Sequence, residues 1–413
     1  MECPEKVYGR EEKNMELQRK NKSLFIDKEA IFALLLCQEG LLYPVTHLMD
    51  EAKMLEVDKT GLYNNQRFPL SFILAPAGKR NEEIIKTATK GEVLDLVYNN
   101  QVYGTLKVDS SFFIDKKERL LKIMSGDIYS QKAQDIYRRL GNYAICGEYN
   151  IITSLANNCF DNRIAKDKIL QFKKSTKAQS ITSMVLDASP ITRIHEHIFR
   201  LILDKNQLLI LLLLRKQNED LLDFQIRKEC LEYVIENFLP KGKIMIFPLD
   251  NIYLFAGAHG IILDAILSQN LGCERIVIGE NYPNLAIYYD HQKIHSIFDT
   301  TKNIKIKVKL LSEFVYCNQC NTIISTKTCP HGKHHHINYS SNFIQSILKA
   351  GLIPPTILVR KEVSAKILSH LFPKRFQHII KQYQTMFSKN GILQEQSEED
   401  FYLKLIELYQ THP

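Results

Sequence analysis

Apolar runs of strand length recur along the chain after the first twenty or so residues. In the N-terminal third, short runs rich in apolar and β-forming residues are separated by Gly, Asn and Lys, and they predict strands. The predicted strands are Phe68–Leu74, Val93–Val97 and Val102–Val108. This pattern is typical of a small β-rich domain between about Ser23 and Gly147.

The second half of the chain changes to short apolar runs that alternate with helical periodicity. Strands are predicted at Ile181–Leu186, Leu208–Leu214, Lys243–Phe247, Glu274–Ile278 and Lys302–Leu310. Helices are predicted around Ile194–Ile202, at Glu229–Phe238 and at Gly260–Asn270. Because strands that alternate with helices form parallel sheets covered on both faces, we expect a Rossmann-like α/β domain.

The boundaries between these regions follow changes in polarity. Residues 161–179 are charged and rich in lysine, with a helical stretch near residues 165–172, and they suit a connection between domains. We predict a polar tail at 1–22, a β-rich domain at 23–175, an α/β domain at 176–371 and a basic helical extension at 372–413.

Composition places the chain among ordinary globular proteins. Hydrophobic residues make up 45% and charged residues 24% of the sequence. The longest apolar run, Leu208–Leu214, is too short to cross a bilayer, and residues 1–22 lack the apolar core of a signal peptide. We therefore expect no membrane partner and a cytoplasmic location. The net charge of +8 is spread widely without a nucleic-acid-binding motif. A small anionic substrate or plain solubility explains this charge as well, so we expect no nucleic-acid partner.

The nine cysteines form no disulfide framework, because six are scattered singly and the total is odd. The other three lie close together as Cys317-x-x-Cys320 and Cys329, and a loop with four histidines follows them. Three thiolates and one imidazole suit a tetrahedral Zn²⁺, and a site with four protein ligands is structural. We expect His335 as the fourth ligand, in preference to His334 and His331. The alternative is a redox pair or unligated thiols.

A second candidate site follows the predicted strand that ends at Leu186. A helix that begins at the C-terminal end of a strand directs free N–H groups and its positive dipole end toward bound phosphate. His195 is suited to donate to a phosphate oxygen. The alternative is that Arg193, His195 and His197 are solvated residues of the first helical turns. Gly279 closes another predicted strand and opens into a polar loop, which is where ligands bind in open α/β sheets.

Several segments together resemble the ATP sulfurylase (sulfate adenylyltransferase) family, between about Leu41 and Leu368. Residues 42–49 are similar to the family's "FSPLxGFM", residues 67–70 to its "RxP" strand, and residues 256–257 with 270–273 to "YAGP…NYGC". Residues 327–331 are close to "KTCPH", residues 348–355 to "LRxGxxPP", and residues 360–363 to "RPEV".

The resemblance implies a PUA-like N-terminal domain and a nucleotidyltransferase domain that carries the zinc site. It also implies MgATP as the nucleotide, a small oxyanion as acceptor and pyrophosphate as product. By position, Thr192, Arg193 and His195 would be the catalytic residues. The residues that would hold the nucleotide are Ser189, His195, Gly257, His259, Gly279 and Ser340.

The departures from the family pattern fall on the residues that carry chemistry. In "QTRNPxHxxHE", Gln and Arg hold sulfate and the two His hold ATP phosphates, whereas this chain has Leu186, Ala188, Ser189 and Thr192 at Gln, Arg, Asn and the first His. "GRDHAG" becomes residues 279–284 with Glu280 at the Arg, and Gln345 replaces the Arg of "SGTxxR". Three readings stay open: a sulfate adenylyltransferase, a non-catalytic or regulatory homologue, and a nucleotidyltransferase with another acceptor. The oligomeric state also stays open.

Overall fold

The computed structural model describes residues 21–126, 128–152, 162–176, 178, 180–204, 207–215, 222–250, 259–279, 304–337, 341–386 and 397–409. These residues form two compact units. The first unit falls within Met1–Phe172, Asp250–Ile276 and Tyr282–Lys309, and the second within Lys173–Leu249, Val277–Asn281 and Leu310–Pro413.

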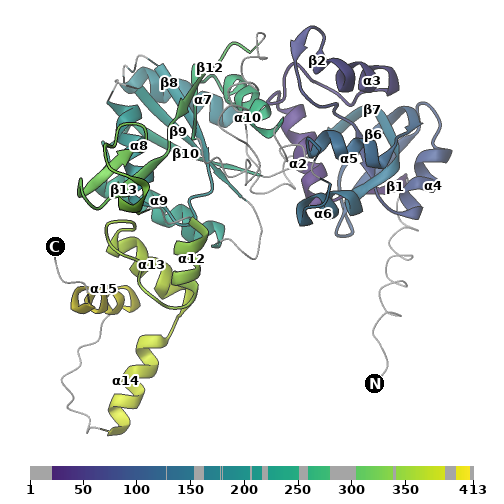
Figure 1. Ribbon diagram of the computed structural model, residues 1–413. Coiled ribbons are helices and arrows are strands. Elements are labelled where there is room, and N and C mark those ends of the chain that lie inside the picture. The colour runs from purple at the N-terminus through teal and green to yellow at the C-terminus, as the bar shows by residue number, and fades with distance from the viewer. Residues whose placement is uncertain are drawn as a thin grey trace. The chain divides into compact units, whose positions relative to one another are not determined.

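The first unit contains a five-stranded sheet in the order β1-β5-β6-β7-β4. Three of its strands, β1, β6 and β7, are labelled in Figure 1. Its strands are β1 (Lys22–Phe25), β4 (Leu74–Pro76), β5 (Val93–Tyr98), β6 (Gln101–Phe113) and β7 (Leu140–Ile151), and a small hairpin pairs β2 (Leu62–Tyr63) with β3 (Gln66–Arg67). β1 and β5 are parallel, and the other neighbours are antiparallel. The predicted strands at 93–97 and 102–108 are therefore confirmed.

The predicted strand at Phe68–Leu74 is wrong, because only Leu74 belongs to a strand. Phe68 and Phe72 are buried, which explains the apolar run, but the main chain of Ser71 bonds to side chains instead of a neighbouring strand. Its N–H donates to Asp58 Oδ1 over 3.1 Å, and its carbonyl accepts from Arg119 Nη2 over 2.6 Å. The segment is thus a buried loop whose polar groups are satisfied from outside the sheet.

The first unit also contains helices. They are α2 (Lys28–Gln38), α3 (Glu51–Thr60), α4 (Lys79–Thr87), α5 (Lys116–Ile123), α6 (Gln131–Arg139) and α10 (His259–Asn270), and α7 (Asn162–Thr176) spans the boundary between the units. Aspartates cap α2, α3 and α5, with Asp27, Asp50 and Asp115 each accepting a hydrogen bond from a first-turn amide.

The second sheet has the order β10-β9-β8-β11-β12. Its strands are β8 (Ser180–Leu186), β9 (Gln207–Leu214), β10 (Ile244–Leu249), β11 (Arg275–Gly279) and β12 (Lys307–Leu311). β8, β9 and β10 are parallel, as predicted, and β8 is buried along its whole length. β12 is shorter than the predicted strand at 302–310, whose first two residues lie outside the described part. The strand order reverses between β8 and β11, and ligands bind at such a reversal in open α/β sheets.

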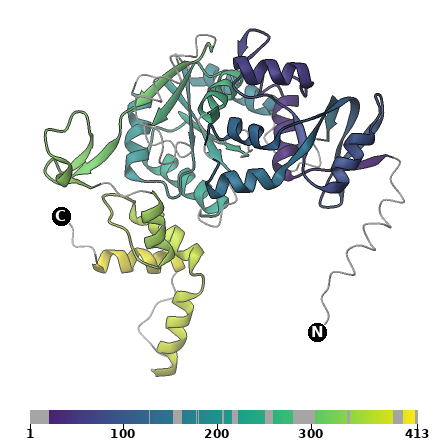
Figure 2. The ribbon, with the colours of Figure 1, turned by 45° about the vertical axis from the view of Figure 1, so that its right-hand side comes forward.

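Helices and a small ribbon complete the second unit. The helices are α8 (Arg193–Leu203), α9 (Phe224–Phe238), α12 (Ser341–Lys349), α13 (Lys361–Leu371), α14 (Arg375–Met386) and α15 (Glu398–Tyr409). The ribbon comprises β13 (Phe314–Cys317), β14 (Thr322–Ser325) and β15 (His336–Ile337), and it projects in light green in Figure 2. One apolar core joins β8 and β9 to α8, α9, α13 and α15, and it contains Tyr402 and Ile406 of the helical extension. No helix in the described ranges is long and apolar enough to span a membrane.

Candidate functional site

The strand-to-helix turn after β8 lies where the sheet order reverses. Leu186 ends the strand with 2% of its surface exposed, and Ala188 in the turn is 3% exposed. Ala188 has φ +49°, a left-handed backbone conformation that is unfavourable for residues other than glycine. α8 then begins at Arg193, with Thr192 as its N-cap. The predicted helix at a strand end is therefore present.

His195 and Thr192 are hydrogen-bonded to each other in the first turn of α8. The Thr192 N–H donates to His195 Nδ1 over 3.1 Å, and the Thr192 hydroxyl lies 2.8 Å from the same nitrogen. Burial lowers the pKa of His195 to about 4, with the nearby Glu196 opposing this shift. The ring is thus neutral at physiological pH, with its proton on Nε2. It can donate one hydrogen bond to an anion but adds no positive charge.

Most of the amides that begin α8 are already hydrogen-bonded within the chain. The Arg193 N–H donates to the Leu358 carbonyl over 2.8 Å, and the Thr192 side chain accepts from the backbone of the third helical residue, His195. Two of the first three helical amides are therefore used. An anion at this terminus would meet fewer free donors than a helix start usually offers.

Arg193 lies away from His195, although both were predicted to be catalytic. Residues two apart on a helix point about 200° apart around its axis. Arg193 Nε donates to the Thr356 carbonyl over 3.3 Å, and its Nη1 lies 3.9 Å from Glu196. The structure therefore does not bring Arg193 and His195 to one site. Glu196 also binds Arg360 through two hydrogen bonds of 2.7 and 2.8 Å.

Ser189 is buried and used within the protein. Its Oγ accepts from the Leu222 N–H over 3.1 Å and donates to Gln345 Oε1 over 3.4 Å. Ser189 is 4% and Gln345 2% exposed. Two positions at which the family resemblance implies Asn and Arg thus form one neutral, buried pair. Sequence reasoning identified both replacements but not the contact between them.

The remaining predicted nucleotide-binding residues are divided between the units and the undescribed part of the chain. Gly279 is the last residue of β11, beside β8 in the second sheet. His259 begins α10 in the first unit, where burial lowers its pKa and Arg67 adds to this effect. Gly257, Ser340 and the departure at Glu280 lie outside the described residues.

A metal-binding group lies at the ribbon, where Cys317, Cys320, Cys329 and His331 place their ligand atoms within 4.8 Å of one another. His331 Nδ1 lies 3.5, 3.2 and 3.7 Å from the three sulfurs, in that order. A tetrahedral zinc with ordinary Zn–S and Zn–N bond lengths would set these separations at about 3.6 Å. The donor set and its spacing therefore fit zinc. Although burial opposes ionisation of Cys317, backbone N–H groups from Cys320 and Gln319 lower its pKa to about 7.

His331 takes the place that we expected for His335. His335 Nδ1 lies 3.0 Å from Asn318 Oδ1, and the ring of His334 lies against that of His335, with centroids 4.0 Å apart. His335 thus holds the turn between the first two cysteines and does not belong to the metal-binding group. His331 lies only two residues after Cys329. This short spacing could have identified His331 as the fourth ligand from the sequence.

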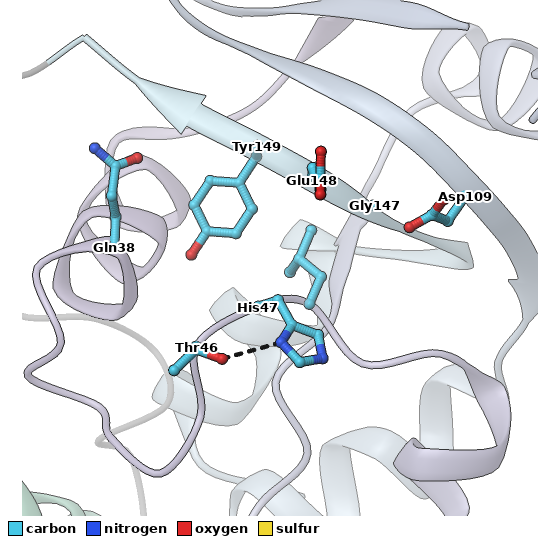
Figure 3. Close-up of a pocket in the computed structure, with 8 residues that line it drawn as sticks. Gln38, Thr46, His47, Asp109, Gly147, Glu148 and Tyr149 are labelled. Atoms are coloured by element: carbon cyan, nitrogen blue, oxygen red, sulfur yellow. Dashed lines mark hydrogen bonds between the residues drawn. The ribbon is translucent and has the colours of Figure 1, made fainter. Parts of the chain in front are cut away.

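The first unit also contains a cavity of about 600 Å³ that sequence reasoning missed (Figure 3). Its lining includes two carboxylates, Asp109 and Glu148, and the imidazole of His47. His47 Nδ1 lies 3.0 Å from the Thr46 hydroxyl. The lining residues come from α2, a loop and the paired strands β6 and β7, so no single sequence motif marks it.

Comparison with known proteins gives consistent results along the chain. The ATP-sulfurylase family model matches residues 162–370, and the model of a PUA-like domain matches residues 4–154. The sulfate adenylyltransferase of Carboxydothermus hydrogenoformans is 24% identical over 354 residues, which cover 83% of this chain and 90% of that protein. The sulfate adenylyltransferase of Chloroflexus aurantiacus is 22% identical, covering 83% of this chain and 89% of that protein.

A solved structure described as a hexameric APS kinase from Thiobacillus denitrificans has the same fold, with a TM-score of 0.63 at 15% identity. The match covers 90% of this chain and 66% of that one. The fold class and the resemblance predicted from sequence are confirmed by these matches. With a PUA-like domain followed by an ATP-sulfurylase domain that matches half of its length, the chain belongs to the ATP-sulfurylase family.

Proposed function

We propose that this protein binds MgATP at the C-terminal ends of β8 and β11, and that it adenylylates sulfate weakly or not at all. The observation that carries the second half of the proposal is the Ser189–Gln345 pair beside Ala188. These three residues stand where the family resemblance implies Asn and two arginines.

The support for nucleotide binding is positional and chemical. β8 and β11 are neighbours in the second sheet, and the β8 turn and Gly279 stand at the C-terminal ends of these two strands, where ligands bind in open α/β sheets. His195, held in one tautomer by Thr192, offers Nε2–H to a phosphate oxygen. Magnesium would arrive with the nucleotide, as part of the substrate.

The support against efficient sulfate turnover is the loss of cationic donors. Sulfate is a dianion, and an arginine binds such groups through a planar two-pronged fork that Ala188 and Leu186 lack. Each fixed donor removed from a developing negative charge costs about a hundredfold to a thousandfold in rate. Arg193 does not replace the missing fork, because its guanidinium is engaged by Thr356 and Glu196.

The ribbon would hold one structural zinc through Cys317, Cys320, Cys329 and His331. When bound, the zinc would cross-link the ribbon. All four of its coordination positions would be occupied by protein ligands, which leaves none for water. The chain's own contribution is to bring four ligands from one short segment into contact, with His335 holding Asn318 in the first turn.

The proposal is tested by pyrophosphate release from MgATP, measured with and without millimolar sulfate, together with calorimetric titration of ATP. We expect ATP binding and little sulfate-dependent release. His195→Ala should weaken ATP binding, whereas the matched control His197→Ala should not, because His197 packs against Phe314. Sulfate-dependent release at ordinary enzyme rates would overturn the claim about sulfate. Unchanged ATP affinity in His195→Ala would overturn the placement of the nucleotide.

A further inference from the structure

Arg227 of α9 is among the most deeply buried charged residues of the described chain, with 1% of its surface exposed. Its guanidinium donates to three main-chain carbonyls. Nη1 donates to Asp187 over 2.7 Å and to Leu214 over 3.0 Å, and Nε donates to Leu222 over 2.8 Å. A buried guanidinium aimed at main-chain carbonyls fixes backbone positions, because its planar fork allows little rotation.

Two of these carbonyls end adjacent parallel strands. β8 and β9 pair through Leu186 and Leu213, so Asp187 and Leu214 are the next residues along each strand. Both residues lie past the last β8–β9 pair, although Leu214 still pairs with Leu249 of β10, and a buried carbonyl without a ladder partner needs another donor. Arg227 supplies a donor to the ends of β8 and β9 at once, and β8 is the strand that borders the reversal in strand order.

The third carbonyl connects Arg227 to the turn that follows β8. Leu222 accepts from Arg227 and donates its N–H to Ser189 Oγ over 3.1 Å. The turn is therefore held at Asp187 directly and at Ser189 through Leu222. Between these two points lies Ala188, with φ +49°, a conformation that persists only when its surroundings impose it.

We infer that Arg227 is a positioning residue for nucleotide binding, which sets the backbone between β8 and α8 without touching the ligand. The inference rests on the proposed nucleotide site. Lysine cannot replace the arginine here, because its single nitrogen cannot take the positions of both Nε and Nη1, from which the three bonds are made.

The test compares Arg227→Lys and Arg227→Met with Arg119→Lys and Arg119→Met. Arg119 is a matched control in the first unit, 3% exposed, and it donates to the Ser71 hydroxyl and carbonyl over 2.6 Å. Each full-length protein is measured for melting temperature, for hydrogen exchange of the amides in residues 187–192, and for ATP affinity by calorimetry.

Both pairs of variants should lose thermal stability. Only the Arg227 variants should exchange the 187–192 amides faster and bind ATP at least about tenfold more weakly, since small displacements of a binding group cost that much or more. Wild-type exchange at 187–192 in Arg227→Lys and Arg227→Met would overturn the inference. So would an equal loss of ATP affinity in the Arg119 variants. If the wild type binds no ATP, the proposed function fails, and the exchange data still decide whether Arg227 holds the turn.

Discussion

The ion pair between Glu196 and Arg360 allows a quantitative test of how α8 is held. Glu196 lies on α8, and Arg360 is the residue before α13. The carboxylate receives two hydrogen bonds of 2.7 and 2.8 Å, and the guanidinium lies over the Phe238 ring, 3.3 Å from its centroid. The side chain of Glu196 is 5% exposed and that of Arg360 is 13% exposed. Arg360→Met would keep the apolar contact and leave the carboxylate buried without this partner.

The expected loss follows from this geometry. Removing one member of a buried pair costs about 3–5 kcal/mol. Arg193 and Arg200 remain 3.9 and 4.0 Å from Glu196, but their side chains are 34% and 46% exposed, so solvent weakens their compensation. We expect a loss near the lower end, about 3 kcal/mol. For a unit of this size, about 2–4 °C per kcal/mol implies that its melting temperature falls by roughly 6–12 °C.

The measurement is thermal and urea unfolding of Arg360→Met beside a control at the next residue. Lys361 pairs with Glu407 over 2.7 Å, but these side chains are 39% and 53% exposed. Lys361→Met should therefore cost no more than about 1 kcal/mol. The double variant Glu196→Gln with Arg360→Met should recover part of the loss, because it removes the uncompensated charge. If Arg360→Met costs no more than Lys361→Met, the inference that this buried pair stabilises α8 is wrong.

Two further predictions concern the metal group and a titrating histidine. Elemental analysis should find one zinc per chain in the wild type and in His335→Ala, but clearly less in His331→Ala; equal zinc in both variants would contradict the ligand assignment. Because the pKa of His195 falls from 6.5 to about 4 on folding, the unfolded state binds more protons between these values, so stability should decrease as pH falls from about 6.5 to 4. His195→Asn should flatten this dependence by at most about 1.4 kcal/mol per pH unit, and identical slopes would refute the shift.

Elements with strong local patterns were predictable from the sequence. The apolar run of β9 is buried as a strand, and the spacing of Ile194, Ile198 and Ile202 places them on one face of a helix. Both assignments were therefore correct. The run Phe68–Leu74 is also apolar, but the main chain of its Ser71 bonds to the side chains of Asp58 and Arg119 rather than to a strand. The composition of an apolar run cannot distinguish a strand from a buried loop. The side chains that bond to the main chain of the loop, Asp58 and Arg119, lie elsewhere in the sequence.

The elements that carry the candidate site were predictable from the sequence, but the contacts between their side chains were not. The strand-to-helix turn follows from local periodicity, and the Cys317, Cys320 and Cys329 ligands follow from their spacing. The Ser189–Gln345 contact joins residues 156 apart, and the bond from Arg193 to Thr356 joins residues 163 apart. Such contacts depend on how α12 and the segment before α13 pack. The choice of His331 over His335 depends on the shape of one loop.

The Ser189–Gln345 pair has a physical consequence for the protein without ligand. Buried arginines that bind an anion have no compensating charge when the anion is absent. Such uncompensated charges destabilise the folded state. An anion then stabilises the protein when it binds, because it binds only the folded form. Ser189 and Gln345 instead satisfy each other, and Leu222 completes the bonding of Ser189. This part of the site is therefore stable without an anion, and it gains little electrostatic stabilisation when one binds. The replacements to which we attribute weak sulfate capture would thus also remove a cost from the fold, because the turn after β8 needs no anion to satisfy Ser189 and Gln345.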